Sequence, residues 1–340
     1  MEATGVKILI PSADMAVVGL TEVFAKLRTI VRAHTRLKSI LRHRRPNLLI
    51  LIDYPDFNIH LARTAKRSNV PVLYYISPQV WAWRRSRIKK IARRVDRMTV
   101  ILPFEKDVYK STSLEVEYVG HPLLDIEPPK LDRDAAIRDM RLAGARPILG
   151  LLPGSRKEEI ENLLPAMVGA AERLAERYPS LRCILPRAST ITPDLIEPLI
   201  RGSTTVITVL GGDIYRTLAL CDVALVASGT ATLETAIMGV PMVIAYRVSP
   251  VSYRLAKMVV RVPFIGLVNL VAGEKIVPEL IQGEVRPERL AAEAIDILEN
   301  DAKRHCMKAQ LARVRDRLGR GGASKRTARI ALEMMTKRVT

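Results

Sequence analysis

The stretch PILGLLPGSRKEEI, residues 147–160, carries an apolar run directly into a glycine-containing turn and a helical segment. Such a unit is typical of a buried parallel strand followed by a helix. Gly154 allows close approach of the backbone, the helix start offers free N–H groups, and Arg156 adds a cation that can bind in bidentate fashion. Together with Ser155 these features predict a phosphate site. An ordinary strand–helix turn with a solvated arginine is the alternative.

A second unit of this kind, VASGTATLETAIMGVP at residues 226–241, follows later in the chain. Its small residues, including Gly229 and Thr230, would let a ligand lie against the start of a helix. Glu234 lies one turn into that helix, where its carboxylate could accept hydrogen bonds from a ribose diol. Because the carboxyl ends of parallel strands meet at one edge of a sheet, the two turns together predict a site for a nucleotide diphosphate.

Apolar strand-like runs alternate with helical segments along the whole chain, which predicts the α/β class with parallel sheets. The runs of the first half are NLLILID (47–53), VPVLYYI (70–76), MTVILP (98–103) and VEYVG (116–120). A segment with three prolines and no period, HPLLDIEPPKLDRDAA, then separates them from a second series. We therefore expect two doubly wound, Rossmann-like domains facing a cleft, at residues 1–145 and 146–300, with a helical tail at 301–340.

The segment IDYPDFN, residues 52–58, stands at the end of a strand-like run in the N-terminal half. Asp53 closes that run, and a carboxylate there faces the crevice in which α/β proteins bind ligands, so Asp53 is a candidate general base. Asp56 falls in the first turn of the next helix, where the helix dipole favours a negative charge. Whether Asp56 and Asn58 have a further role stays open.

The sequence contains no Walker pattern, GxGxxG, CxxC pair or HExxH. Its five histidines form no ligand cluster, and His121, in VGHP near the domain boundary, has no assigned role. Three cysteines without metal spacing are typical of reduced thiols in a cytosolic protein. We expect neither a metal nor a cofactor.

The formal net charge is +19 over 340 residues and is unevenly distributed. Residues 1–120 hold 22 Lys and Arg against 10 Asp and Glu. This asymmetry favours a polyanionic partner of the N-terminal half, namely phosphates, nucleic acid or an anionic membrane surface; a solvated basic face is the alternative. No apolar run approaches the roughly 18 residues of a membrane span, and the first residues do not have the pattern of a signal peptide.

Both tryptophans of the chain lie in YYISPQVWAWRRSRIKKIARRVDR, residues 74–97, directly before a dense basic segment. A nucleic-acid platform, a membrane-facing belt and a packed loop are three interpretations of this arrangement. A platform for nucleic acid would need several interleaved aromatic residues, and none follows Trp83 in the basic segment. We therefore expect no nucleic-acid partner.

Taken together, these motifs resemble those of the bacterial lipid-A-disaccharide synthases in order and approximate spacing. The motifs that carry the resemblance are AVVGLTEV, IDYPDFN, the segment 74–97, PFE, VGHPLLD, LLPGSR, ASGTATLE, GVPMVIAYRVSP and VPELIQ. They extend from about residue 5 to about residue 290, and the helical tail is also similar. The combination is far more specific than any one turn.

The resemblance implies a two-domain GT-B glycosyltransferase of lipid A and lipopolysaccharide biosynthesis, without a catalytic metal. Such enzymes move a 2,3-diacylglucosamine unit from UDP to the 6-hydroxyl of 2,3-diacylglucosamine 1-phosphate, with inversion. The resemblance also implies a cytoplasmic enzyme bound peripherally at the inner membrane, with C-terminal helices that pack back or are exchanged in a homodimer. Another UDP-sugar GT-B enzyme, such as an epimerase or a muropeptide-type transferase, is one alternative. A non-catalytic basic binding module is the other.

The resemblance also implies roles for single residues. Asp53 matches the family's catalytic aspartate, which takes the proton of the acceptor hydroxyl. Arg156 and the helix start beside it would stabilise the departing pyrophosphate, and Glu234 would hold the ribose. Asn269 matches a polar position of the family's active site, although Val268 stands where the family usually has proline.

Both substrates of this family carry acyl chains, which bears on the two tryptophans. An indole pair beside a basic helix suits a wall for such a lipid at a membrane edge. Trp81 and Trp83, with Arg84 and Arg85, are therefore expected at the acceptor or membrane side, with packing of one indole into the loop as the alternative.

The chain also departs from the family at its start, where members have about 45 further residues that include a first strand and a glycine loop. Doubly wound sheets keep their first strand in the middle. We therefore expect the 340-residue chain to have a weakened N-terminal domain and little transferase activity.

Overall fold

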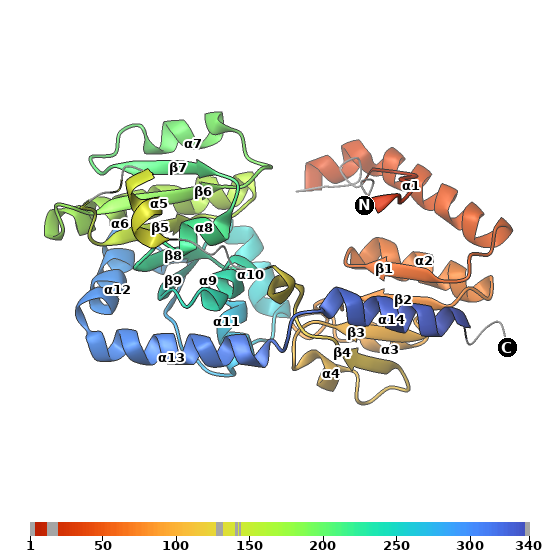
Figure 1. Cartoon of the computed structure of the whole chain (residues 1–340). Coiled ribbons are helices and arrows are strands. Elements are labelled where there is room, and N and C mark those ends of the chain that lie inside the picture. The colour runs from red at the N-terminus through yellow and green to blue at the C-terminus, as the bar shows by residue number, and fades with distance from the viewer. Residues whose placement is uncertain (1–3, 12–19, 127–131, 140–141, 143, 337–340) are drawn as a thin grey trace.

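The computed structural model describes residues 4–11, 20–126, 132–139, 142 and 144–336. Within these ranges the chain forms two α/β units, each built on one parallel sheet (Figure 1). The predicted α/β class with two parallel sheets is confirmed. None of the helices in the described ranges is both long and apolar enough to cross a bilayer.

The N-terminal unit consists of α1 (Leu20–His43), β1 (Leu49–Ile52), α2 (Pro55–Arg67), β2 (Val72–Tyr75), α3 (Arg87–Ala92), β3 (Arg97–Val100), α4 (Glu105–Val108) and β4 (Glu115–Tyr118). Its strands have the order β1-β2-β3-β4, and each neighbouring pair is parallel. The core is mostly aliphatic, as the low aromatic content requires, with the buried Tyr74 and Tyr109 as its large aromatic members.

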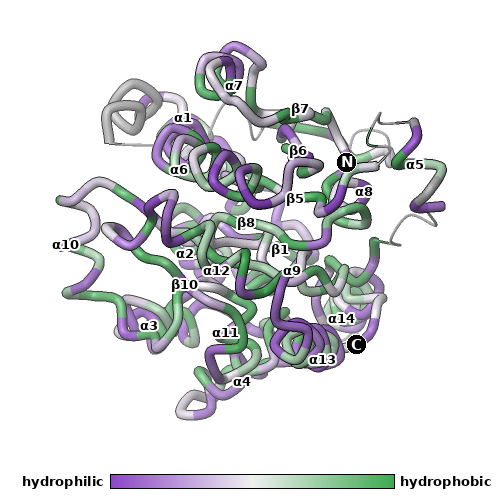
Figure 2. Tube along the Cα trace, turned by 90° about the vertical axis from the view of Figure 1, so that its left-hand side faces the viewer, coloured by the Kyte–Doolittle hydropathy of each residue, from purple (hydrophilic) through white to green (hydrophobic). Residues whose placement is uncertain are grey.

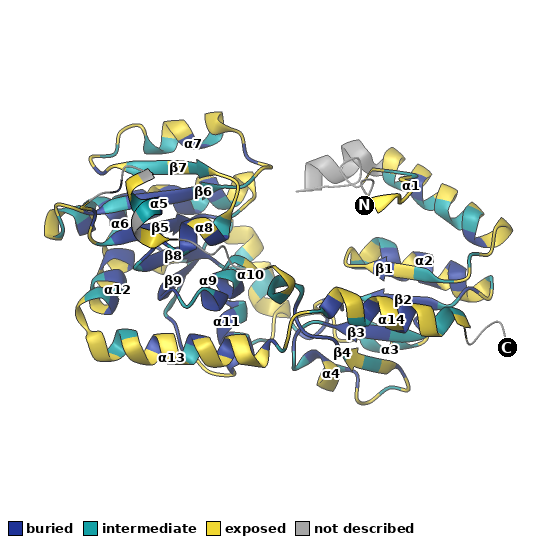
Figure 3. Cartoon of the chain, viewed as in Figure 1, coloured by how far each residue is buried: buried dark blue, intermediate teal, exposed yellow. Residues whose placement is uncertain are grey.

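The C-terminal unit consists of α5 (Arg133–Asp139), β5 (Ile148–Leu152), α6 (Lys157–Arg177), β6 (Arg182–Arg187), α7 (Pro193–Ile200), β7 (Ile207–Gly211), α8 (Ile214–Leu218), β8 (Val223–Ala227), α9 (Ala231–Ile237), β9 (Met242–Tyr246), α10 (Pro250–Val259), α11 (Leu267–Ala272), β10 (Glu279–Ile281) and α12 (Pro287–Glu299). Its six parallel strands have the order β10-β9-β8-β5-β6-β7. Every residue of β5 and β8 is buried, as Figure 3 shows for the middle of this sheet. The strand order reverses between these two strands, which is the place where doubly wound sheets bind their ligands.

The residues that directly precede β5 in the described ranges already pack with the C-terminal unit. Ala136, Leu142 and Ala145 belong to the same buried cluster as β5 and β8. On α5, Arg133 forms an ion pair with Asp222, at 2.9 Å, directly before β8. These residues, which we assigned to the first domain, are therefore held by the second in the structure.

The last two helices belong to different units. Helix α13 (Asp301–Arg317) packs on α9 and α11 of the C-terminal unit. The chain then turns through residues 318–322, which include three glycines, and α14 (Ala323–Thr336) lies against the N-terminal sheet (Figure 1). There Ile330 and Ala331 pack with Leu73 and Val119. The C-terminal helix thus packs back on its own chain in this structure.

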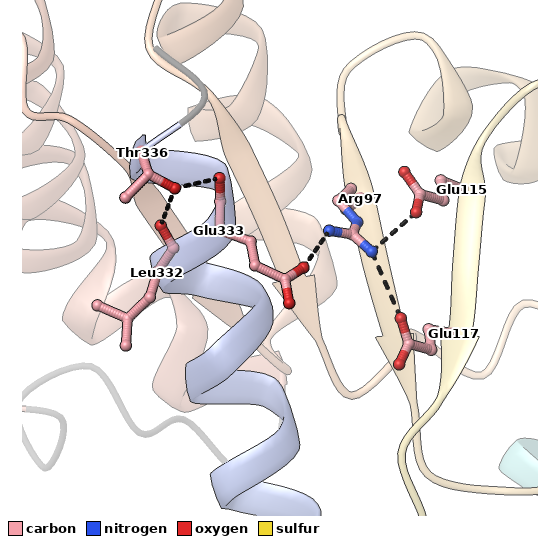
Figure 4. Close-up of polar contacts among 6 residues, drawn as sticks. All are labelled: Arg97, Glu115, Glu117, Leu332, Glu333 and Thr336. Atoms are coloured by element: carbon pink, nitrogen blue, oxygen red, sulfur yellow. Dashed lines mark hydrogen bonds and ion pairs between the residues drawn. The ribbon is translucent and has the colours of Figure 1, made fainter. Parts of the chain in front are cut away.

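Polar contacts hold both ends of α14. Near its C-terminal end, Glu333 forms an ion pair with Arg97 of β3 at 3.3 Å, and Arg97 also contacts Glu115 and Glu117 of β4 (Figure 4). At its start, the Asp125 carboxylate accepts backbone N–H bonds from residues 322–324. Asp125 ends a short 3-10 helix (Pro122–Asp125) after β4, so a residue of the N-terminal unit caps the returning helix.

We expect Asp125→Ala to loosen α14 because it leaves the N–H groups at the helix start without their acceptor. Loss of such a cap costs about 1–2 kcal/mol. Hydrogen exchange of the α14 amides should therefore become about 5–30 times faster. Asp107→Ala, at an exposed aspartate that pairs with Lys110, serves as the control. Unchanged protection of α14 in the Asp125 variant would contradict this role.

Candidate active site

A cavity of about 420 Å³ opens where the carboxyl ends of β5 and β8 meet. The six residues that the sequence predicted for nucleotide binding all line it: Gly154, Ser155, Arg156, Gly229, Thr230 and Glu234. The structure thus brings the two turns together at the point where the strand order reverses. The cavity has the size of a small-molecule site.

The first turn is shaped by Gly154 and Glu159. Gly154 has φ +112°, and a Cβ there would overlap the Glu159 carboxylate. That carboxylate accepts the backbone N–H groups of Ser155 at 3.0 Å and Arg156 at 3.2 Å, and it pairs with the Arg156 guanidinium at 2.7 Å. A negative group therefore already occupies the N–H donors that the sequence assigned to a phosphate. We did not single out Glu159, although it lies three residues after Arg156, where a glutamate can reach back to the N–H group at a helix start.

The second turn leaves space for a ligand. A Cβ at Gly229 would meet no atom within 4 Å, so the start of α9 is open there. Ser228 anchors the turn by donating its hydroxyl to the Ile265 carbonyl at 3.0 Å. Burial raises the pKa of Glu234, whose carboxyl lines the same cavity.

Arg187 is a cavity residue that the sequence analysis missed. It ends β6, next to β5 in the sheet, and its guanidinium donates to the Ile191 carbonyl at 2.5 Å. With Arg156 it gives the cavity two guanidinium groups. The signal was available in RCILPRAS, where a basic residue follows an apolar run at the sheet edge that already carried the first turn.

On the N-terminal unit, Asp53 directly follows β1 in a backbone conformation that side chains rarely adopt. Asp53 has φ 48° and Tyr54 φ 44°, both in the left-handed region. The Asp53 carbonyl accepts hydrogen bonds from the Tyr74 hydroxyl at 2.7 Å and the Asn58 amide at 2.6 Å. Two buried side chains therefore hold this strained turn, and strain of this kind gathers at functional sites. Ile76, which follows β2, also has a positive φ, of 66°.

Asp56 connects the turn after β1 with the basic segment. Its carboxylate pairs with Arg87 and lies 3.6 Å from Arg84. Asp56 thus has ion-pair partners in addition to its place in the first turn of α2. Arg85 is exposed between these two arginines.

The two tryptophans have different surroundings. Trp81 is buried, donates its indole N–H to Glu105 at 3.1 Å and packs edge-on against Phe104. Trp83 is exposed, and the Arg84 guanidinium stands 4.2 Å from its ring centre. The alternative of one packed indole therefore applies to Trp81, and Trp83 is the indole that faces outward.

Glu105 is a buried carboxyl that supports the Trp81 loop. Burial raises its pKa to about 7, although hydrogen bonds from the Leu102 N–H, the Trp81 indole and the Ile101 N–H oppose this rise. Burial also lowers the pKa of His121, to about 4. The neutral His121 ring accepts the Leu123 N–H at 3.2 Å, which indicates a capping function for this residue.

Asn269, expected among the polar groups facing the ligand, lies in the interior. It is fully buried in α11, and its amide donates to the Val277 carbonyl at 3.0 Å and to Glu279 at 2.8 Å. Its oxygen accepts the N–H groups of Ile276 and Val277. Both polar atoms of the side chain are thus engaged inside the C-terminal unit.

This architecture, with two parallel α/β units and a nucleotide-sized cavity at the switch point of one, defines the chain as a GT-B type protein. Solved structures of the same fold include the UDP-GlcNAc 2-epimerase of Neisseria meningitidis, with a TM-score of 0.59 at 13% identity over 93% of this chain and 82% of that one. Another is the trehalose-6-phosphate synthase OtsA, with a TM-score of 0.54 at 12% identity, over 94% of this chain and 78% of that one.

The family follows from sequence comparison. The family model described as lipid-A-disaccharide synthetase matches residues 1–334. Lipid-A-disaccharide synthase of Geobacter sulfurreducens is 48% identical over 339 residues, covering 100% of this chain and 88% of the relative. That of Syntrophus aciditrophicus is 46% identical over 338 residues, covering 99% and 88%. The chain belongs to the lipid-A-disaccharide synthase family and is a glycosyltransferase of lipid A biosynthesis. Membership of this family decides against the alternatives of an epimerase, a muropeptide-type transferase and a non-catalytic binding module.

The raised pKa of Glu105 predicts a pH dependence of stability. Between its ordinary pKa of 4.5 and the folded value of about 7, the folded state binds more protons at this group than the unfolded chain does. The contribution of Glu105 to stability is therefore complete below pH 4.5 and is lost as pH rises through 7, a difference of about 3 kcal/mol. Glu105→Gln does not ionise, so its melting temperature should rise relative to the parent between about pH 4.5 and 8.

Melting curves at a series of pH values test this expectation, with Glu161→Gln on exposed α6 surface as the control. A constant difference between Glu105→Gln and the parent would show that the carboxyl does not titrate in this range.

Proposed function

We propose that the cavity at the carboxyl ends of β5 and β8 binds the UDP group of a donor, UDP-2,3-diacylglucosamine. The acceptor would be 2,3-diacylglucosamine 1-phosphate, and the products the lipid A disaccharide 1-phosphate and UDP. One observation carries this proposal. The starts of α6 and α9, the guanidinium groups of Arg156 and Arg187 and the carboxyl of Glu234 all line one cavity. Helix starts and arginines bind phosphates, and a carboxylate binds a ribose diol.

Within this cavity, Arg156 and Arg187 would neutralise the pyrophosphate. The Glu159 carboxylate now occupies the N–H groups of Ser155 and Arg156, so we propose that the pyrophosphate takes its place. Glu234 would accept hydrogen bonds from the ribose. The charge on the leaving UDP would then be stabilised by Arg156, Arg187 and the N–H groups that Glu159 releases.

Asp53 is proposed as the general base. Its carboxylate would take the proton from the acceptor 6-hydroxyl while that oxygen bonds to the anomeric carbon and UDP leaves from the opposite face. Tyr74 and Asn58 would act as positioning residues, because they hold the Asp53 carbonyl and with it the left-handed turn. Asn269 is likewise proposed as a positioning residue. It holds Glu279, whose carboxylate accepts the N–H groups of Ile265 and Gly266.

We propose that the enzyme acts at the cytoplasmic face of the inner membrane and attaches peripherally to its anionic surface. The acyl chains of both substrates keep them in a bilayer, and the net charge of +19 suits such a surface. Trp83, Arg84 and Arg85 are exposed and would face the lipid. A homodimer is also proposed, in line with the expectation for the family.

Asp53→Asn should remove the base while keeping the size of the side chain. General-base catalysis contributes about 10²–10⁴-fold, so turnover of the two acylated sugars should fall by this factor. The UDP-induced rise in melting temperature should stay, because Asp53 lies in the other unit. Asp107→Asn is the control at an exposed aspartate. Unaltered turnover would show that Asp53 is not the base.

Arg156→Ala should instead weaken both UDP binding and turnover, since it removes a cation from the pyrophosphate. Loss of a charged hydrogen-bond partner costs about 1.5–3 kcal/mol, or about 10–150-fold in the Kd for UDP. Calorimetric titration with UDP measures this effect. Arg289→Ala, on the exposed face of α12, should leave the Kd as it is. A change confined to the KM of the acceptor would assign Arg156 to the other substrate.

A further inference from the structure

Helix α10 presents an apolar stripe to solvent. Val251, Leu255, Met258 and Val259 have the spacing that places side chains on one face of a helix. A surface helix normally turns this face to the core, but these residues are 66%, 56%, 71% and 52% exposed. No residue of α10 is buried. The stripe is therefore available for a partner outside the described chain.

Basic residues flank this stripe. Arg254 and Lys257 lie on α10 beside it, and Arg261 follows the C-cap residue Val260. All three are exposed, and none forms an ion pair within the described ranges. The sequence from 235 to 273 contains no aspartate or glutamate. A short helix with an apolar face and a basic flank is the pattern of a segment that lies in a membrane interface.

The surface continues onto the other unit of the molecule. The backbone N–H of Arg261 donates to the Ala82 carbonyl at 3.0 Å, which places the end of α10 against the loop that carries Trp83. In Figure 2, α10 lies at the edge of the molecule on the same side as α3, which follows that loop. Residues 77–95 also contain no acidic residue. One apolar and basic surface thus extends over both units.

We propose that α10 and the Trp83 loop form a composite docking surface for an anionic lipid bilayer. The proposal rests on the proposed function, and it adds α10, which the sequence analysis did not single out. The apolar stripe and the Trp83 ring would enter the interface between headgroups and acyl chains. Arg85, Arg254 and Lys257 would meet the lipid phosphates.

The position of the surface supports a bilayer as the occupant. Helix α10 follows β9, so it stands at the same sheet edge as the nucleotide cavity. A bilayer at this edge would present substrate headgroups to the cleft while their acyl chains stay in lipid. The uniform positive charge favours an anionic lipid surface over a second copy of this basic chain.

The test measures sedimentation of the full chain with vesicles of phosphatidylcholine and phosphatidylglycerol. Leu255→Ser with Met258→Ser should lower the partition coefficient about tenfold or more, because it removes apolar groups from the buried face. Leu332→Ser with Val206→Ser, at two exposed positions distant in sequence from α10, is the matched control and should bind like the parent. Arg254→Gln with Lys257→Gln should lower binding to anionic vesicles and leave binding to pure phosphatidylcholine unchanged.

Trp83 supplies a second readout. Vesicles with brominated acyl chains should quench the fluorescence of the parent, and Trp83→Phe should abolish this quenching, since Trp81 is buried. The α10 variants should keep the UDP-induced rise in melting temperature, which separates failure of this proposal from failure of the nucleotide site. Parent-like vesicle binding of the Leu255/Met258 variant would overturn the proposal. A variant that changes its oligomeric state but still binds vesicles would also overturn the proposal, because the stripe would then contact a second copy of the chain.

Discussion

The reversal of strand order between β5 and β8 is the constraint on which the cavity of the C-terminal unit depends. Both strands are fully buried, so helices must cover both faces of the sheet there. Because crossover connections are right-handed, α6 and α9 leave the two strands on opposite faces while their starts stay at one edge. Each start directs backbone N–H groups towards the cavity, and at the start of α6 those of Ser155 and Arg156 already bind a carboxylate, that of Glu159. Arg156 and Arg187 reinforce a potential that the topology already creates.

The carboxyl edge of the N-terminal sheet has a different structure. Here the backbone itself is unusual, with left-handed residues at Asp53, Tyr54 and Ile76 after two neighbouring strands. Such conformations cost about 1–3 kcal/mol each and persist only where neighbours enforce them. Tyr74 enforces the first from the interior, and burial raises the pKa of its hydroxyl, so it remains a donor to the Asp53 carbonyl. One unit thus supplies a cavity lined by two guanidinium groups, and the other a strained backbone turn that carries Asp53.

Much of this arrangement could be predicted from the sequence, because apolar runs, glycine turns and helix starts are local signals. The meeting of Gly154 and Thr230 follows from parallel strands alone. Contacts between distant side chains could not be predicted. Nothing local distinguishes Trp81, which Glu105 binds in the interior, from Trp83, which stays outside. The same holds for Asn269, whose amide is saturated by a loop that follows it in sequence.

The composite surface links membrane contact to the geometry between the two units. Its two parts lie on different units and are joined, within the described residues, by the backbone hydrogen bond from Arg261 to Ala82, while the chain returns to the N-terminal unit in the turn between α13 and α14. A rotation of one unit against the other would separate α10 from the Trp83 loop. A bilayer that binds both parts at once therefore favours the arrangement in which they are adjacent, by the difference in its affinity for the two arrangements. Since the cavity and Asp53 lie on opposite units, the same lipid contact would favour the arrangement that sets the distance between the proposed donor site and the proposed base.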